Sequence, residues 1–246
     1  MTQPVPFLDI DTSSRKPVEV AILACPGYAP IDVIGLHTIF GILPGATVHL
    51  VWKNTDVVIG EPNFPTVPTT TFDRCPRDLD VLFTGAVMPA TFDDEETLEF
   101  LADRGSRAGW VGGTCAGPLL LGAAGLMRGY RATANFQQRD LLSLFGAIPT
   151  DADVVEDRNR ITAGPATGSI DIALRLVQLF FGDEIARIME LQIEYAPRPL
   201  FGVGSPELAG PELTGAALAR SAPMSAMFAP VLERAARRLA ATPATA

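Results

Sequence analysis

Residues 110–121 of the chain read Trp-Val-Gly-Gly-Thr-Cys-Ala-Gly-Pro-Leu-Leu-Leu, an order that predicts a strand, a sharp turn and a helix. Positions 113–117 form a Gly-x-Cys-x-Gly pattern, the thiol version of the elbow that carries the nucleophile in many hydrolases. Small residues on either side allow a strained turn, so we expect Cys115 to stand above the carboxyl edge of a sheet as a candidate nucleophile. In the alternative interpretation, Cys115 is a buried cysteine and its glycines serve packing alone.

The helix predicted after the turn bears on the chemistry of this thiol. Its N-terminal amides point toward the sulfur, and such a position lowers the pKa of a cysteine. The backbone amide of Ala116 is free to stabilise a developing negative charge. Cys25 and Cys75 lack this context, and we expect both to be ordinary core or loop residues.

Short apolar runs alternate with helical patterns along the rest of the chain. Residues 18–24 and 79–84 are typical of buried strands, whereas residues 93–107 and 169–181 have the charge distribution and spacing of helices. This alternation, with short connections, predicts an α/β fold with a mainly parallel central sheet flanked by helices. The expected organisation is a flexible leader at 1–17, an α/β domain at 18–206, and a C-terminal extension at 207–246 with a helix over 227–240.

Composition excludes several kinds of partner. The 246 residues carry 19 Lys and Arg against 28 Asp and Glu, a formal net charge of −9, so we expect no nucleic-acid partner. No stretch reaches the roughly 18 apolar residues of a membrane span, and the N-terminus lacks a signal-peptide pattern, so we expect a cytoplasmic protein with no membrane partner. With His37 and His49 as the two histidines, we expect no metal site and no Cys–His catalytic pair.

Asp32 is the candidate proton partner for the thiol. It follows the first predicted strand, and the loops after parallel strands meet at the carboxyl edge of the sheet, where ligands bind. Its neighbours Ile31 and Val33 are apolar, an environment that raises the pKa of a carboxyl group and lets it hold a proton. The other interpretation makes Asp32 a helix cap, and the residues alone leave both open.

The sequence resembles the PfpI-type branch of the class I glutamine-amidotransferase-like superfamily and, within it, the isocyanide (isonitrile) hydratases. The resemblance begins with the elbow and the segment 121–133 that follows it. Further matching stretches span most of residues 18–206 and are Pro26-Gly27, 32–40, 48–53, 69–72, 80–82, 94–101, 159–162 and 191–197.

The resemblance implies a flavodoxin-like α/β sandwich, a homodimer, a small-molecule substrate and no cofactor. It implies that Cys115 is the nucleophile and that Asp32 is the acid that contacts its sulfur. Gly85 matches a glycine whose amide joins that of Ala116 in an oxyanion-type pocket, and Gly164 and Ala166 fall on a loop that lines the substrate pocket. The implied reaction adds water to an isocyanide carbon, through a cysteine thioimidate, to give an N-substituted formamide.

Several positions depart from the hydratase pattern and keep alternatives open. Ala116 stands where the hydratases carry Thr, Ala134-Asn135-Phe136 replaces a Thr-His-Trp run, and Pro165 interrupts the glycine-rich loop. One alternative is another cysteine-dependent hydrolase or lyase, such as an amidase, a glyoxalase-type enzyme or a natural-product tailoring enzyme. The other is a thiol-oxidation sensor or ligand-binding module.

Overall fold

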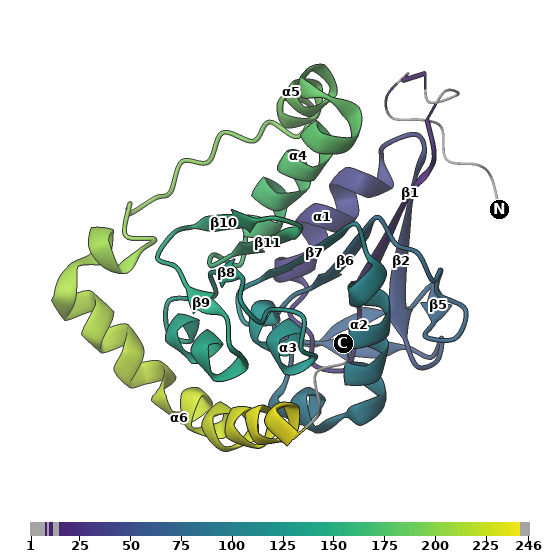
Figure 1. Cartoon of the computed structure of the whole chain (residues 1–246). Coiled ribbons are helices and arrows are strands. Elements are labelled where there is room, and N and C mark those ends of the chain that lie inside the picture. Colours follow the sequence, from purple (N-terminus) through teal and green to yellow (C-terminus); the bar gives the residue numbers. More distant parts are fainter. Residues whose placement is uncertain (1–7, 9, 12–14, 242–246) are drawn as a thin grey trace.

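A seven-stranded central sheet organises the computed structural model, which describes residues 8, 10–11 and 15–241. Figure 1 shows the sheet, whose strand order is β10-β11-β7-β6-β1-β2-β5. Neighbouring strands run parallel except β10, which is antiparallel to β11. The predicted mainly parallel α/β fold is therefore confirmed. The leader predicted at residues 1–17 falls largely outside the described residues.

The elements alternate along the chain much as the apolar pattern predicts. The strands are β1 (Val18–Leu23), β2 (Ala46–Trp52), β3 (Val58–Gly60), β4 (Phe64–Thr66), β5 (Thr70–Thr71), β6 (Val81–Thr84), β7 (Trp110–Thr114), β8 (Arg131–Ala132), β9 (Ile148–Pro149), β10 (Val154–Asp157) and β11 (Arg160–Ala163). The helices are α1 (Ile31–Gly41), α2 (Glu95–Arg107), α3 (Gly117–Ala123), α4 (Gly168–Phe181), α5 (Asp183–Gln192) and α6 (Pro206–Ala241), with 3₁₀ helices η1 (Pro89–Asp93) and η2 (Arg139–Phe145).

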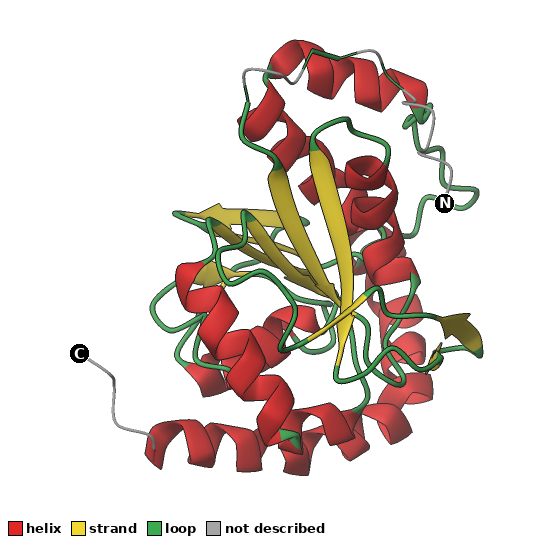
Figure 2. Ribbon diagram, turned by 90° about the vertical axis from the view of Figure 1, so that its right-hand side faces the viewer, coloured by secondary structure: helices red, strands yellow, loops and turns green. Residues whose placement is uncertain are grey.

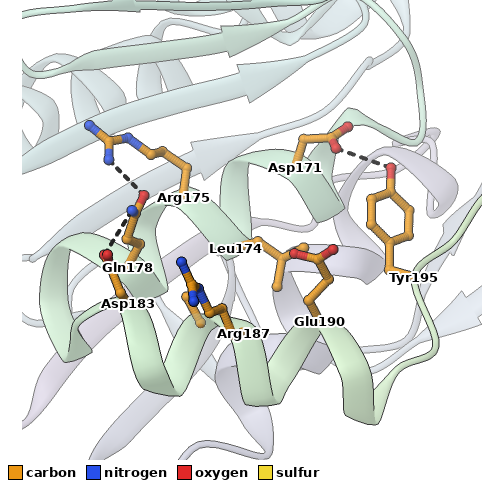
Figure 3. A pocket seen from close by; sticks show the side chains of 9 residues that line it. Asp171, Leu174, Arg175, Gln178, Asp183, Arg187, Glu190 and Tyr195 are labelled. Carbon is orange, nitrogen blue, oxygen red and sulfur yellow. Dashed lines mark hydrogen bonds between the residues drawn. The ribbon is translucent and has the colours of Figure 1, made fainter.

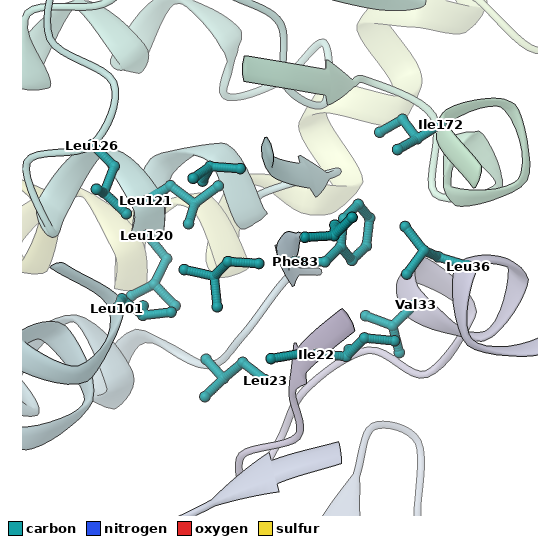
Figure 4. Packing of buried hydrophobic residues seen from close by; sticks show 14 of the residues in the cluster. Ile22, Leu23, Val33, Leu36, Phe83, Leu101, Leu120, Leu121, Leu126 and Ile172 are labelled. Atoms are coloured by element: carbon teal, nitrogen blue, oxygen red, sulfur yellow. The ribbon is translucent and has the colours of Figure 1, made fainter. Parts of the chain in front are cut away.

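Helices cover both faces of the sheet (Figure 2). On one face α1 packs against α4, and on the other α2 packs against α3. Figure 4 shows Leu36 of α1 and Leu120 of α3 on opposite sides of Phe83, a residue of the central strand β6. All four residues of β6 are buried, which explains its continuous apolar sequence. Packing on both faces holds the strands in place. The candidate site is built at the ends of these strands.

The C-terminal segment differs from its prediction. The glycine, proline and alanine content of residues 201–223 is typical of a segment that wraps the surface, and the predicted helix covers residues 227–240 alone. Instead α6 begins at Pro206 and is interrupted at Gly210, whose φ is 73°. The many alanines favour the helix, and Pro211 directly follows the break, where a helix tolerates proline best. No helix in the described part of the chain is long and apolar enough to cross a membrane.

Candidate active site

The turn between β7 and α3 has the predicted elbow geometry. Cys115 has a φ of 57°, a left-handed conformation that is uncommon outside glycine and that stores strain. Its backbone amide donates to the carbonyl oxygen of Ala163 at 3.0 Å, which fastens the elbow to the end of the neighbouring strand β11. The side chain of Cys115 is half-buried, whereas Cys25 and Cys75 are buried as expected.

The two glycines of the elbow are required by close approach to β6. A Cβ on Gly113 would lie 2.9 Å from the carbonyl oxygen of Thr84, and a Cβ on Gly117 would lie 2.3 Å from the same atom. Backbone cannot yield at such distances, so both positions exclude a larger residue. These glycines therefore do serve packing, as the alternative interpretation of the motif expects. They also flank the strained turn at Cys115.

Asp32 lies in the first turn of α1 and is only 1% exposed. Its Oδ2 accepts a hydrogen bond from the backbone amide of Ala86 at 2.7 Å. The N-cap of α1 is Pro30, and no side chain caps this helix, so the interpretation of Asp32 as a helix cap is wrong. A Cβ on Gly85 would lie 2.4 Å from the Cβ of Asp32, so Gly85 leaves the space that the acid occupies.

The structure brings Asp32 and Cys115 together, and each changes the protonation of the other. Burial raises the pKa of Asp32 to about 6, although hydrogen bonds with the Ala86 amide and with Cys115 oppose the rise. The apolar surroundings predicted for this carboxyl group thus have the expected effect. The acid holds or releases a proton near neutral pH, as general acid–base chemistry requires.

The prediction that the helix lowers the pKa of Cys115 is wrong. Burial and the negative charge of Asp32 raise the pKa of Cys115 to about 12, although hydrogen bonds from the Ala116 amide and from Asn135 lower it. The helix α3 has seven residues, and its amides are outweighed by desolvation and by the adjacent carboxylate. At neutral pH the sulfur therefore carries its proton, facing a carboxylate that can accept it.

Asn135 is the site residue that sequence reasoning missed. Its backbone amide donates to the carbonyl oxygen of Cys115 at 2.9 Å. Its Oδ1 accepts from the backbone amide of Gln137 at 3.1 Å, which leaves its Nδ2 as the donor toward the sulfur. Asn135 follows β8, whose pairing with β9 is not apparent from the sequence. One sequence feature could have pointed to this residue: Asn135 stands where the hydratase pattern has a histidine.

The predicted substrate loop lies beside the elbow. Gly164 is buried, and a Cβ on it would lie 2.9 Å from the carbonyl oxygen of Ala134, the residue before Asn135. Ala166 is half-buried in the same connection between β11 and α4. Because the Cys115 amide bonds to Ala163, this loop begins directly next to the thiol. Its role in holding a substrate stays a prediction.

The remaining polar candidates do not join this site. His49 Nε2 lies 2.7 Å from Glu19 Oε2 on the strands β2 and β1. Burial lowers the pKa of His37, which is on α1, and raises that of Cys25 to about 12. In the described residues, no group of three or more His, Cys, Asp or Glu side chains is arranged to hold a metal ion.

Sequence comparison shows which known proteins this chain resembles. Residues 18–179 match the model of the DJ-1/PfpI family. The chain is 39% identical over 224 residues to an isonitrile hydratase of Pseudomonas putida, covering 90% of this chain and 98% of that protein.

Solved structures agree with this match. A THiJ/PfpI family protein from Pseudomonas syringae superposes with a TM-score of 0.85 at 38% identity, covering 96% of this chain and 98% of the other. DJ-1beta of Drosophila melanogaster shares the fold, with a TM-score of 0.66 at 18% identity over 74% of this chain and 100% of its own.

Proposed function

Because this chain belongs to the DJ-1/PfpI family, we propose that its Asp32–Cys115 pair makes it an isocyanide hydratase. The proposed reaction adds water to the terminal carbon of an isocyanide and releases an N-substituted formamide. Similarity to an isonitrile hydratase over nearly the whole length of both chains supports this assignment. The observation that carries it is a thiol with a raised pKa in hydrogen-bond contact with a carboxyl group whose pKa is about 6.

In the first step, Asp32 moves the thiol proton to the substrate. The carboxylate of Asp32 accepts the proton of Cys115 and delivers it to the isocyanide carbon as the sulfur bonds to the same carbon. The product is a thioimidate, R–N=CH–S–Cys115, and the carboxyl group is ionised again. A shared proton suits this addition, because the sulfur becomes a thiolate only when an electrophile is present.

In the second step, water takes the place of the sulfur. The carboxylate of Asp32 accepts a proton from a water molecule as the water oxygen bonds to the thioimidate carbon, and Asp32 then delivers this proton to the nitrogen. The C–S bond then breaks, the carbon keeps the oxygen as a formamide carbonyl, and the second water proton returns to the sulfur through Asp32. One carboxyl group thus acts in turn as base and acid, as in retaining glycosidases.

Five further residues support the pair in this proposal. The Ala116 amide and the Asn135 side chain stabilise negative charge on the sulfur, since both lower the pKa of Cys115. We assign to Gly85 the room for Asp32 and a backbone donor toward the substrate, and to Gly164 and Ala166 one wall of the substrate pocket. No metal or organic cofactor takes part in the proposed steps. We further propose that the protein is cytoplasmic, because unpaired cysteines suit a reducing compartment, and that it is a homodimer, as the family resemblance implies.

The alternative enzymatic activities differ from isocyanide hydration in the substrate that reacts with Cys115. Ala116 cannot donate a side-chain hydrogen bond, and Pro165 has no backbone N–H, so another electrophile on the same nucleophile is the second candidate. A thiol-oxidation sensor fits less well, because oxidation proceeds through the thiolate, and a pKa of about 12 keeps Cys115 protonated.

The test is a screen with cyclohexyl isocyanide, an aromatic isocyanide, glyoxal and simple amides. The expected result is formation of the formamide, detected by mass spectrometry, with loss of turnover in Cys115→Ala and retention in the matched control Cys25→Ala. Turnover of glyoxal or an amide without formamide formation moves the assignment to the second candidate. Formamide formation by Cys115→Ala at the wild-type rate would falsify the nucleophile role.

A further inference from the structure

The antiparallel hairpin of β3 and β4 is hydrogen-bonded to the loop between β1 and α1. The backbone amide of Gly27 donates to the carbonyl oxygen of Ile59 at 2.8 Å, and the amide of Glu61 donates to the carbonyl oxygen of Tyr28 at 2.8 Å. The phenol oxygen of Tyr28 lies 2.7 Å from Oγ1 of Thr66. Three hydrogen bonds therefore join the hairpin to the β1–α1 loop, which ends just before the candidate acid.

The ring of Tyr28 fits closely against the hairpin because position 60 has no side chain. A Cβ on Gly60 would lie 2.9 Å from Cε1 of Tyr28 and 2.9 Å from its carbonyl oxygen. Tyr28 is buried, and burial raises the pKa of its phenol, so the phenol stays uncharged at neutral pH. The hydroxyl of Tyr28 therefore meets Thr66 as a neutral hydrogen-bonding group.

The backbone of Ala86 connects the β1–α1 loop to the acid. Its carbonyl oxygen accepts from the amide of Ala29 at 2.9 Å, and its amide donates to Oδ2 of Asp32 at 2.7 Å. The amide of Asp32 in turn donates to the carbonyl oxygen of Ala29 at 3.1 Å. Ala29 directly follows Tyr28 in the chain, so a displacement of Tyr28 is passed to both backbone partners of the acid.

We propose that Tyr28 is a positioning residue for Asp32: its hydrogen bond to Thr66 holds the β1–α1 loop in place, and that loop orients the carboxyl group through the backbone of Ala86. Tyr28 acts through the backbone and contacts no reacting atom. The inference deepens the proposed function, on which its kinetic test rests, because it names the part of the fold that aims the acid at the thiol.

The loss of this hydrogen bond should change the proton affinity of Asp32 in one direction. The Ala86 amide lowers the pKa of Asp32, against the larger effect of burial. In the described part of the chain, the titratable group that contributes to this pKa is Cys115 at the end of β7, whose hydrogen bond also lowers it. A β1–α1 loop that is free to move weakens the bond from Ala86, so the pKa of Asp32 should rise above its value of about 6.

The kinetic test compares Tyr28→Phe, Thr66→Val and the double variant. Tyr28→Phe keeps the ring that packs on the hairpin and removes the hydroxyl alone. In both single variants we expect the pH at which kcat/KM is half-maximal to rise by about half a unit or more. We also expect kcat at pH 8 to fall about threefold or more with KM unchanged, because the carboxyl group is displaced and no substrate contact is lost.

Two further variants test whether a single bond is responsible. Both single substitutions break the same hydrogen bond, so the double variant should show no larger effect than either one. Thr66→Ser keeps a hydroxyl and should resemble the wild type. Additive effects of Tyr28→Phe and Thr66→Val would mean that the two residues act separately, and would overturn the proposal.

A second measurement does not depend on turnover. Carbon-13 NMR titration of the Asp32 carboxyl carbon should show the same rise in pKa in both single variants. The matched control is Tyr195→Phe, which removes a phenol that donates to Oδ1 of Asp171 at 3.1 Å in the pocket between α4 and α5 (Figure 3). Because this bond lowers the pKa of Asp171, the control should raise that pKa and leave the pKa of Asp32 unchanged.

The outcomes separate this inference from the proposed function. An unchanged pKa of Asp32 in Tyr28→Phe and Thr66→Val overturns the positioning role, even where both variants lose stability. A rise of the same size in Tyr195→Phe overturns it too, since the effect would then not come from the β1–α1 loop. A wild type that does not hydrate isocyanides, with the expected NMR shifts, overturns the proposed function and leaves the positioning role in place.

Discussion

Thr114 donates a hydrogen bond from its Oγ1 to the backbone carbonyl oxygen of Asp32 at 2.7 Å. Thr114 is fully buried and directly precedes Cys115. This bond joins the end of β7 to the first turn of α1, the two elements that carry the thiol and the acid. The relative position of Asp32 and Cys115 is therefore set by this buried hydrogen bond from the Thr114 side chain to the Asp32 backbone, as well as by the side chains of the pair themselves.

Replacing Thr114 tests whether this contact positions the pair. Thr114→Val keeps the branched shape and removes the donor, so we expect a loss of about 1–2 kcal/mol in unfolding free energy. We also expect kcat for isocyanide hydration to fall at least about tenfold with little change in KM, because small displacements of reacting groups slow chemistry steeply. Denaturant unfolding and steady-state kinetics provide the two measurements.

A matched threonine separates positioning from stability. Thr97 is also fully buried, and its Oγ1 donates to Asp94 at 3.0 Å at the start of α2. Thr97→Val should cost similar stability and leave kcat unchanged, while Thr114→Ser should recover most of the lost kcat. Equal effects of Thr114→Val and Thr97→Val on kcat contradict the positioning role.

The elbow and the acid could be predicted because their signals are local. The spacing of the glycines indicates the strained turn at Cys115, and the apolar neighbours of Asp32 indicate that its side chain is buried. The pKa of Cys115 could not be predicted in the same way, because it depends on a balance between helix amides and a carboxylate that is 83 positions away in the sequence. The position of Asn135 depends on the path of the chain after α3, and no periodicity encodes that path.

The pH dependence follows from the pKa of Asp32. Above a pH of about 6 the carboxylate is ionised while Cys115 keeps its proton, so the pair holds the single proton that the proposed addition needs. We expect kcat/KM to rise as pH increases through about 6 and to level off by about pH 8. A profile that falls over this range, measured with an uncharged isocyanide, contradicts the assignment.

Iodoacetamide should alkylate Cys115 before the other two cysteines because its side chain is more exposed than theirs, and not because its pKa is low. Burial raises the pKa of Cys25 to about 12 and that of Cys75 to about 11, and both side chains are at most 2% exposed. Cys115 is half-buried, so we expect it to be labelled first, slowly at pH 7 and faster at alkaline pH. Peptide mass mapping over time measures the order. Labelling of Cys75 before Cys115 contradicts the expectation.

Asn135 should control the reactivity of the same thiol. Its side chain lowers the pKa of Cys115, so Asn135→Ala should raise that pKa and slow alkylation at fixed pH by a few-fold or more. Asn135→Asp places a second carboxylate near the sulfur and should slow it further. Gln138→Ala, three residues along the same loop, is the control and should leave the rate unchanged. Wild-type rates in both Asn135 variants remove this residue from the site.

Neutralising Asp32 should stabilise the fold while it removes activity. The folded pKa of about 6 lies above the ordinary value of 3.8, so the folded state binds this proton more tightly than the unfolded chain does. Unfolding free energy therefore falls as pH rises from about 4 to 6, and above that range the ionised Asp32 costs stability. Asp32→Asn keeps an acceptor for the Ala86 amide and should gain about 1–3 kcal/mol at pH 8, since one pKa unit corresponds to about 1.4 kcal/mol.

The same variant should lose at least about 100-fold in kcat, because an amide cannot accept and return the proton. Asp171 is the matched control, since burial also raises its pKa and it lies on α4 in contact with Tyr195. Asp171→Asn should leave kcat unchanged.

Asp32→Glu should recover part of the activity lost in Asp32→Asn, because it restores a carboxyl group at a slightly displaced position. Thermal unfolding at pH 5 and pH 8, with kinetics at pH 8, distinguishes the outcomes. An Asp32→Asn protein that is more stable and fully active shows that the carboxyl group is strained but not catalytic. One that is less stable at pH 8 shows that the ionised acid supports the fold, and that the direction argued here for its pKa is wrong.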